Sequence, residues 1–167
     1  MLQHLNIEQF TTQSGVAQDL KLSYQVFGKP LHTAPIILVN HALTGNSNVA
    51  GKDGWWSDLI GDGKCIDTEK YTILSFNIPG NGFDGFIIEN YKDFVAGDIA
   101  RIFLWGLKEL EIDKLFAIIG GSLGGGIAWE MTAINPKITE HLIPVASDWK
   151  STDLLIANCQ IQEQFLV

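Results

Sequence analysis

The chain has 167 residues, a length that favours one domain, and its apolar content of 46% is enough for a hydrophobic core. The formal net charge is −8 and the 11 basic residues are scattered, which argues against nucleic-acid binding, since phosphates are neutralised by clustered Lys and Arg. Only 18% of residues are charged and the mean hydropathy is +0.14. These values are somewhat apolar, so we expect an obligate partner or a piece of a larger fold.

The cysteines and the N-terminus indicate where the protein resides. Cys65 and Cys159 belong to no Cys-x-x-Cys pair or Cys/His cluster, so we expect reduced thiols and no metal site. The first residues hold no basic segment followed by an apolar one, which predicts that there is no secretory signal. The apolar runs are too short to span a bilayer. The sequence therefore predicts a cytoplasmic protein that binds no membrane.

The first half of the chain contains strand patterns and one helical pattern. Polar and apolar residues alternate over 7–11 and 20–27, which predicts an antiparallel hairpin at the edge of a sheet. Continuous apolar runs at 35–40 and 71–77 predict strands buried on both faces. Apolar residues at helical spacing over 91–110 predict an amphipathic helix of about five turns.

The second half alternates strand and helix patterns. We expect a strand at 115–119, a helix at 125–134, a strand at 141–146 and a helix from about 150 to 165. A hairpin followed by alternating strands and helices predicts an α/β fold with a mostly parallel open sheet and right-handed crossovers. We assign 1–167 to a single domain.

Glycines surround one serine between the strand at 115–119 and the next helix. Gly120-x-Ser122-x-Gly124 has the Gly-x-Ser-x-Gly pattern of a nucleophile elbow, a strained strand-to-helix turn that exposes a serine hydroxyl. Glycines beside the serine let strand and helix approach closely. Ser122 would then lie at the carboxyl end of a central strand, where open α/β sheets build their sites.

A serine nucleophile needs a base to take its proton and donors for the developing oxyanion. One donor would be the backbone N–H of Leu123, the residue directly after the nucleophile. The other should come from the loop after the strand at 35–40, which reads Asn40-His41-Ala42-Leu43-Thr44-Gly45.

Four blocks occur in order along the chain: His41-Ala42-Leu43-Thr44-Gly45, Gly51-x-x-Gly54-Trp55-Trp56, Ile66-Asp67-Thr68-x-x-Tyr71 and Ile118-Ile119-Gly120-Gly121-Ser122-Leu123-Gly124-Gly125. Together they resemble the homoserine O-acetyltransferase family of the α/β-hydrolase superfamily, from about residue 20 to the end of the chain. The resemblance implies that Ser122 is the acyl-accepting nucleophile and that the N–H groups of Leu43 and Leu123 form the oxyanion hole.

The same resemblance implies a reaction of methionine biosynthesis. Acetyl-CoA would be the co-substrate that donates the acyl group, and the hydroxyl of L-homoserine would accept it in a ping-pong scheme. No cofactor and no metal are implied. Full-length members would form homodimers.

The chain departs from the family pattern in two places. Typical members carry a Gly-Gly-rich segment at the position of residues 77–85. The resemblance therefore does not predict which residues form the acyl pocket. Only 45 residues follow Ser122, whereas the acid and the histidine of an α/β-hydrolase follow the nucleophile along the chain. We therefore expect a partial domain, truncated after about the sixth strand, without the lid, the C-terminal strands, the acid and the base.

The four histidines offer no obvious replacement for the base. His4 and His32 are expected in solvent, and His41 is expected to hold its loop by hydrogen bonds. His141 begins a strand, at the end opposite the site. A general base must first lie within hydrogen-bonding distance of the proton that it takes, whatever its pKa. We therefore expect none of the four histidines to act as the base.

Two further patterns have alternative interpretations. Asp148 follows the strand at 141–146, from which some α/β-hydrolases recruit the acid, but we favour a helix N-cap or a carboxylate in the first turn of the helix. Gly80-x-Gly82-x-x-Gly85 matches a dinucleotide-binding fingerprint. Because no helix pattern follows it directly, we favour a loop near the site.

Three functions stay open at this point. The leading one is the N-terminal part of a homoserine O-acetyltransferase, favoured by the His-Ala-Leu-Thr-Gly block. A general α/β-hydrolase esterase would use the same elbow, since the two reactions differ mainly in whether water is excluded. An inactive fragment or interaction module would follow from the missing acid and base. The sequence does not determine whether the transferred group is acetyl or succinyl, or which alcohol accepts it.

Overall fold

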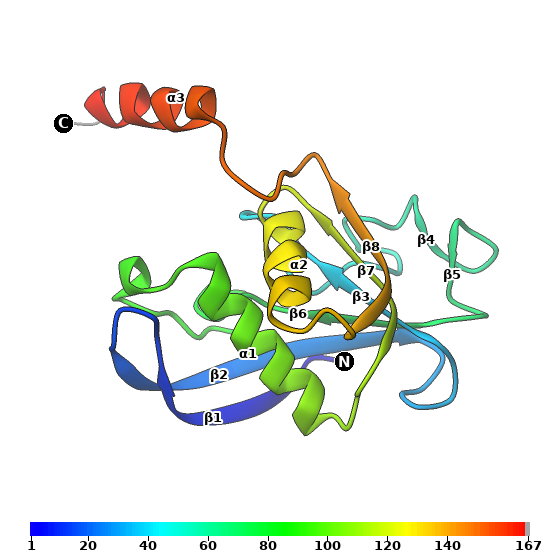
Figure 1. The fold of residues 1–167 in the computed structure, drawn as a ribbon. Coiled ribbons are helices and arrows are strands. Elements are labelled where there is room, and N and C mark those ends of the chain that lie inside the picture. The colour runs from blue at the N-terminus through cyan, green and yellow to red at the C-terminus, as the bar shows by residue number, and fades with distance from the viewer. Residues whose placement is uncertain (166–167) are drawn as a thin grey trace.

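The computed structural model describes residues 1–165, in which six strands form one sheet. The strands are β1 (Gln3–Thr11), β2 (Ala17–Gly28), β3 (Ile36–Asn40), β6 (Thr72–Phe76), β7 (Leu115–Gly121) and β8 (Thr139–Val145). Their order across the sheet is β1-β2-β6-β3-β7-β8 (Figure 1). β1 and β2 form an antiparallel hairpin, β2 pairs antiparallel with β6, and β6, β3, β7 and β8 are parallel. The predicted α/β sheet and its edge hairpin are confirmed.

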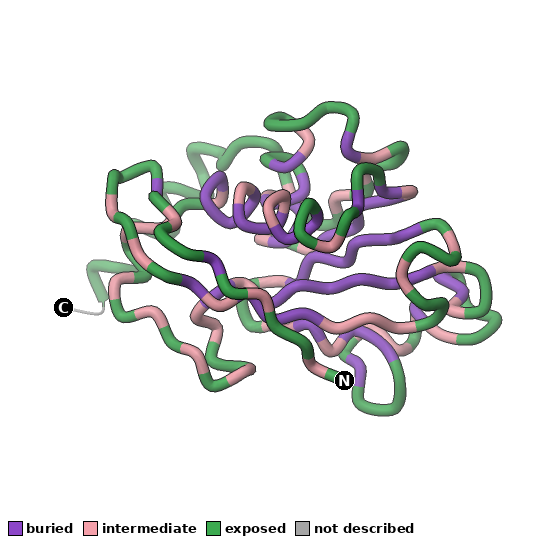
Figure 2. The backbone as a smooth tube through the Cα atoms, turned by 90° about the horizontal axis from the view of Figure 1, so that it is seen from below, coloured by how far each residue is buried: buried purple, intermediate pink, exposed green. Residues whose placement is uncertain are grey.

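Two helices, α1 (Ala96–Glu109) and α2 (Leu123–Ile134), cover one face of the sheet (Figure 1). Apolar side chains of both helices and of the strands form one buried cluster there, which includes Leu38, Leu74, Ile102, Phe103, Leu107, Ile118, Ile127 and Met131. The central strands are buried along their length (Figure 2), as expected for strands covered on both faces.

The second face of the sheet is covered by the long connection between β3 and β6 rather than by a helix. Val49, Ala50 and Ile60 of this connection pack against strand residues that include Val39 and Ile73. The connection contains a short parallel pair, β4 (Ile60–Gly61) and β5 (Ile66–Asp67). Its sequence has no helical or strand periodicity, so this cover was not predicted.

The helix expected over 91–110 is divided, which corrects the sequence prediction. A 3-10 turn, η1 (Tyr91–Asp93), precedes α1, and the residues between them are extended. The buried carboxylate of Asp98 explains this break. It accepts the N–H of Val95 at 3.1 Å and the N–H of Gln13 at 2.9 Å, so it caps α1 and ties the helix to the β1–β2 turn.

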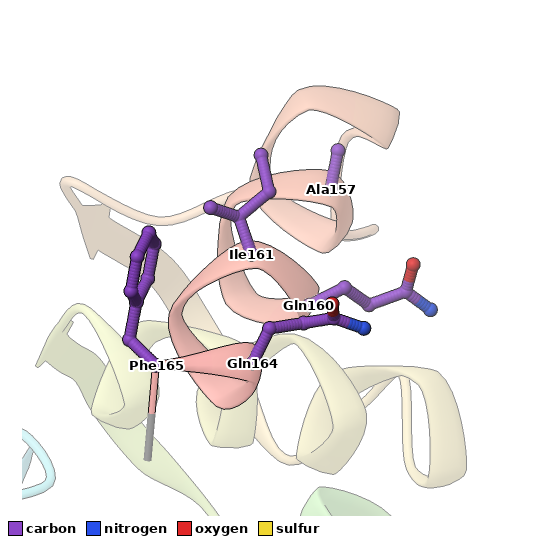
Figure 3. A pocket seen from close by; sticks show the side chains of 5 residues that line it. All are labelled: Ala157, Gln160, Ile161, Gln164 and Phe165. Atoms are coloured by element: carbon purple, nitrogen blue, oxygen red, sulfur yellow. The ribbon is translucent and has the colours of Figure 1, made fainter. Parts of the chain in front are cut away.

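The last helix, α3 (Asp153–Gln164), stands away from the sheet (Figure 1). Its N-cap is Thr152, whose Oγ1 accepts the Leu155 N–H at 3.2 Å, and none of its residues is buried. A shallow hollow is lined by Ala157, Gln160, Ile161, Gln164 and Phe165 (Figure 3). Since these residues come from α3 and its C-cap, the hollow does not include Ser122. Across residues 1–165, no helix is both long and apolar enough to cross a membrane.

Candidate active site

Ser122 lies at the turn between β7 and α2 with φ 51° and ψ −119°. A positive φ in a residue with a side chain costs about 1–3 kcal/mol and persists only where the surroundings hold it. Here the Ser122 N–H donates to the Val145 carbonyl at 2.9 Å, and the Ser122 carbonyl accepts the N–H of Gly125 at 2.9 Å. The residue is exposed and its hydroxyl does not cap the helix. The turn therefore presents the Ser122 hydroxyl to solvent at the carboxyl end of a central strand.

Glycine is required at two positions beside this turn. A Cβ on Gly120 would lie 2.2 Å from the Gly124 carbonyl oxygen, and a Cβ on Gly124 would lie 2.3 Å from the Asn40 carbonyl oxygen. Both neighbours are backbone atoms, which cannot rotate away. The first turn of α2 is thus packed directly against the ends of β3 and β7 because these residues have no side chain.

The loop of residues 41–47 brings Leu43 to the same edge of the sheet as Ser122. β3 and β7 are parallel neighbours, with Asn40 opposite Gly120, so the segments that follow both strands meet at one edge. Among residues 1–165, neither the Leu43 N–H nor the Leu123 N–H has a protein acceptor. For Leu123 this follows from its place as the first residue of α2. Two unpaired N–H groups therefore lie at the edge that carries Ser122.

His41 holds the start of the 41–47 loop. It is 1% exposed, its Nε2 accepts the Ile78 N–H at 3.0 Å, and its Nδ1 lies 2.7 Å from the Ala42 carbonyl, to which it donates. Burial lowers the pKa of His41, and the bond to Ala42 opposes this only in part. The ring is therefore neutral with its proton on Nδ1, and neither nitrogen is available as a base. The expected structural role is confirmed.

The neutral state of His41 makes stability depend on pH. Its folded-state pKa is lowered, so below the ordinary value of about 6.5 the unfolded chain binds more protons than the folded one. Stability is then fully present above that pH and is lost as the pH falls toward the folded-state pKa. Urea unfolding between pH 7.5 and 5 should show this loss, and His41→Gln should reduce it. The control is His32→Gln, at an exposed loop residue; an equal pH dependence in both variants would contradict the prediction.

Asp148 neither caps the last helix nor lies in its first turn, so the favoured interpretation is wrong. Thr152 occupies the N-cap position. Asp148 lies in the exposed segment after β8, and its Oδ1 accepts the N–H of the next residue, Trp149, at 2.8 Å. The sequence prediction failed because the segment between β8 and α3 is longer than the pattern indicated.

The glycine-rich segment after β6 is a loop, as we favoured. Gly80, Gly82 and Gly85 have φ values of 82°, 78° and 80°, and an isolated bridge joins Asn81 to Ile87. α1 begins only at Ala96. A dinucleotide site needs a helix N-terminus directly after the glycines to receive the pyrophosphate, and this segment provides none.

Sequence reasoning missed a set of buried and half-buried polar residues around the end of the 41–47 loop. Ser23, Gln25, Ser47, Asn77 and Asn81 are joined by side-chain hydrogen bonds. They come from β2, from the loop itself and from the segment after β6, so only the folded chain brings them together. The only sequence feature that could have indicated this set is Asn77, a polar residue directly after a buried strand.

The similarity to known proteins identifies first the fold family and then a group within it. Residues 35–158 match the family model described as the alpha/beta hydrolase fold. The chain belongs to the α/β-hydrolase fold family. Within that family, the resemblance to homoserine O-acetyltransferases is confirmed by several curated relatives of that name.

The relative from Desulfotalea psychrophila, named homoserine O-acetyltransferase, is 34% identical over 170 residues, which cover 89% of this chain and 44% of the relative. Among solved structures, the homoserine O-acetyltransferase of Staphylococcus aureus has a TM-score of 0.84 and 30% identity, covering 98% of this chain and 52% of that one. The structure of esterase E22 has a TM-score of 0.79 and 26% identity, and the match covers 96% of this chain and 51% of the esterase. The chain therefore spans about half the length of the relatives it matches.

Proposed function

We propose that this chain is the nucleophile-bearing part of an acyltransferase that moves an acetyl group from acetyl-CoA to the hydroxyl of L-homoserine. The observation that carries the proposal is the strained turn at Ser122, with the unpaired N–H groups of Leu43 and Leu123 at the same sheet edge. The acyl donor and acceptor are inferred from the relatives named homoserine O-acetyltransferase.

The proposed reaction has two half-reactions through an acetylated Ser122. The Ser122 oxygen attacks the thioester carbonyl, a base takes its proton, and the negative charge moves to the carbonyl oxygen, where the N–H groups of Leu43 and Leu123 stabilise it. The carbon–sulfur bond then breaks and CoA leaves as the thiol after receiving that proton. The homoserine hydroxyl attacks the acetyl group in the same way, which forms O-acetylhomoserine and releases the serine.

Hydrolysis is the second candidate function. The similarity to esterase E22 favours it, and so does the exposed position of Ser122. A transferase must keep water from the acyl-enzyme, because water and an alcohol attack the same carbonyl. The two functions therefore differ in which nucleophile removes the acetyl group from Ser122.

The experiment supplies acetyl groups as p-nitrophenyl acetate, with imidazole added as an external base that can reach the exposed serine. Because this ester also acetylates imidazole, the yields of Ser122→Ala are subtracted as the background. We expect acetylation at Ser122, detected by peptide mass spectrometry and absent in Ser122→Ala. When L-homoserine is then added, the transferase should yield O-acetyl-L-homoserine, whereas an esterase should yield only acetate. Equal O-acetylhomoserine formation by Ser122→Ala would exclude the proposed role of the serine.

A further inference from the structure

The end of the 41–47 loop is fixed by one buried amide. Asn77, the first residue after β6, is 1% exposed. Its Oδ1 accepts the Ser47 N–H at 2.7 Å, and its Nδ2 donates to the Ser47 Oγ at 3.0 Å. A single side chain therefore holds both the backbone and the side chain of the last residue of the loop.

Asn77 is itself held by β2. Its Nδ2 also donates to the Ser23 Oγ at 2.8 Å, and its backbone N–H donates to the Ser23 carbonyl at 2.8 Å. The Ser47 hydroxyl in turn donates to Gln25 Oε1 at 2.8 Å. Because Ser23 and Gln25 are part of a long strand in the sheet, the end of the loop takes its position from the sheet.

The start of the loop is held by the residue that follows Asn77. The Ile78 N–H donates to Nε2 of His41, so two consecutive residues fix the first and the last residue of the loop. Between these two points lies Leu43, a residue that is 73% exposed. Its N–H has no acceptor among residues 1–165. The direction of this N–H therefore depends on the two ends of the loop.

We propose that Asn77 is a positioning residue for the oxyanion hole, because its bonds to Ser47 set the direction of the Leu43 N–H toward the acyl oxygen on Ser122. This inference rests on the proposed function, since Leu43 needs an oxyanion to bind. Oxyanion donors act through preorganisation, which means that they do not move when charge develops. A donor on an exposed loop meets this condition only when other residues lock the loop.

The test compares Asn77→Ala with Ser75→Ala in the whole chain. Ser75 is a matched control because it is also buried and lies two residues earlier, but its Oγ donates to the Val39 carbonyl at 2.8 Å, in β3 rather than in the loop. With p-nitrophenyl acetate and imidazole, Asn77→Ala should lower the saturating rate of Ser122 acetylation by about 10²-fold, as misplacement of a catalytic group does. The half-saturating ester concentration should not change. Ser75→Ala should keep the parent rate.

Three further observations complete the test. Amide exchange at Leu43 should become faster in Asn77→Ala and not in Ser75→Ala. Asn77→Asp keeps the size of the side chain and an acceptor for the Ser47 N–H, and the Ser23 and Ser47 hydroxyls can turn to donate to its second oxygen, so it should restore most of the rate. If Asn77→Ala does not fold, Ser47→Ala removes the Oγ contacts from the loop side and should lower the rate in the same direction.

The outcomes separate this proposal from the proposed function. Ser122 acetylation that is as fast in Asn77→Ala as in Ser75→Ala overturns the role of Asn77 and leaves the nucleophile in place. Acetyl uptake that is as fast in Ser122→Ala as in the parent chain overturns the proposed function, and the role of Asn77 fails with it.

Discussion

Gly124→Ala is expected to lower the free energy of unfolding by about 3 kcal/mol or to prevent folding, as overpacking at a backbone contact does. The added Cβ would lie 2.3 Å from the Asn40 carbonyl oxygen. Asn40 cannot move aside, because it is the last residue of β3, opposite Gly120 of β7. The Asn40 Nδ2 also donates to the Gly124 carbonyl at 3.3 Å. The helix would have to shift away from the strands and would carry the Ser122 turn with it.

Gly126→Ala is the matched control for this prediction. Gly126 lies two residues later in α2, and a Cβ placed there would meet nothing within 4 Å. Replacing a glycine by alanine in an unobstructed helix position stabilises by about 0.5–1 kcal/mol. Urea unfolding of the two variants should therefore give shifts of opposite sign. A Gly124→Ala chain as stable as Gly126→Ala would show that α2 does not pack against β3 as described.

The sequence was informative wherever one local pattern determined the structure. The apolar runs at 35–40 and 71–77 correspond to β3 and β6, because strands covered on both faces need apolar residues at every position. The glycine pattern around Ser122 placed a strand-to-helix turn correctly, since close packing leaves no room for side chains there. The patterns that predict these features are local in the sequence, although the glycine at 124 is required by its contact with the distant Asn40.

Features that depend on distant residues could not be predicted. The start of α1 is determined by Asp98, whose carboxylate accepts the N–H of Gln13, 85 residues earlier in the chain. The cover on the second face of the sheet is irregular, so it has no periodicity to detect. The bonds from Asn77 to Ser23 and Ser47 join three separate segments. These contacts join segments that are separated in the sequence.

Steady-state acetyl transfer from acetyl-CoA to L-homoserine by this chain, without an added base, is expected to be negligible. A general base must come within about 2.6–3.2 Å of the proton it takes, or act through one water. The chain has four histidines. His41 already uses both ring nitrogens, and His32 lies in the connection before β3, which starts at the opposite edge of the sheet from Ser122.

The two remaining histidines are too far from Ser122. His4 is in β1, four strands away from β7 in the sheet, which is about 19 Å at the usual spacing of about 4.8 Å. His141 pairs with Ala117, five residues before Ser122 along the chain, or about 16 Å at about 3.3 Å per residue. The serine therefore has no histidine to take its proton.

The expected deficit is large, because removing the histidine of a serine triad costs about 10⁶-fold in kcat. The residual rate comes from the oxyanion hole and from binding alone. Release of the CoA thiol, followed with a thiol reagent, should therefore be equally slow in the parent chain and in Ser122→Ala. Turnover that disappears only in Ser122→Ala would contradict the prediction and would show that another group takes the proton. Asp148, exposed after β8, would then be the first residue to replace, because it lies three residues after Val145, whose carbonyl accepts the Ser122 N–H.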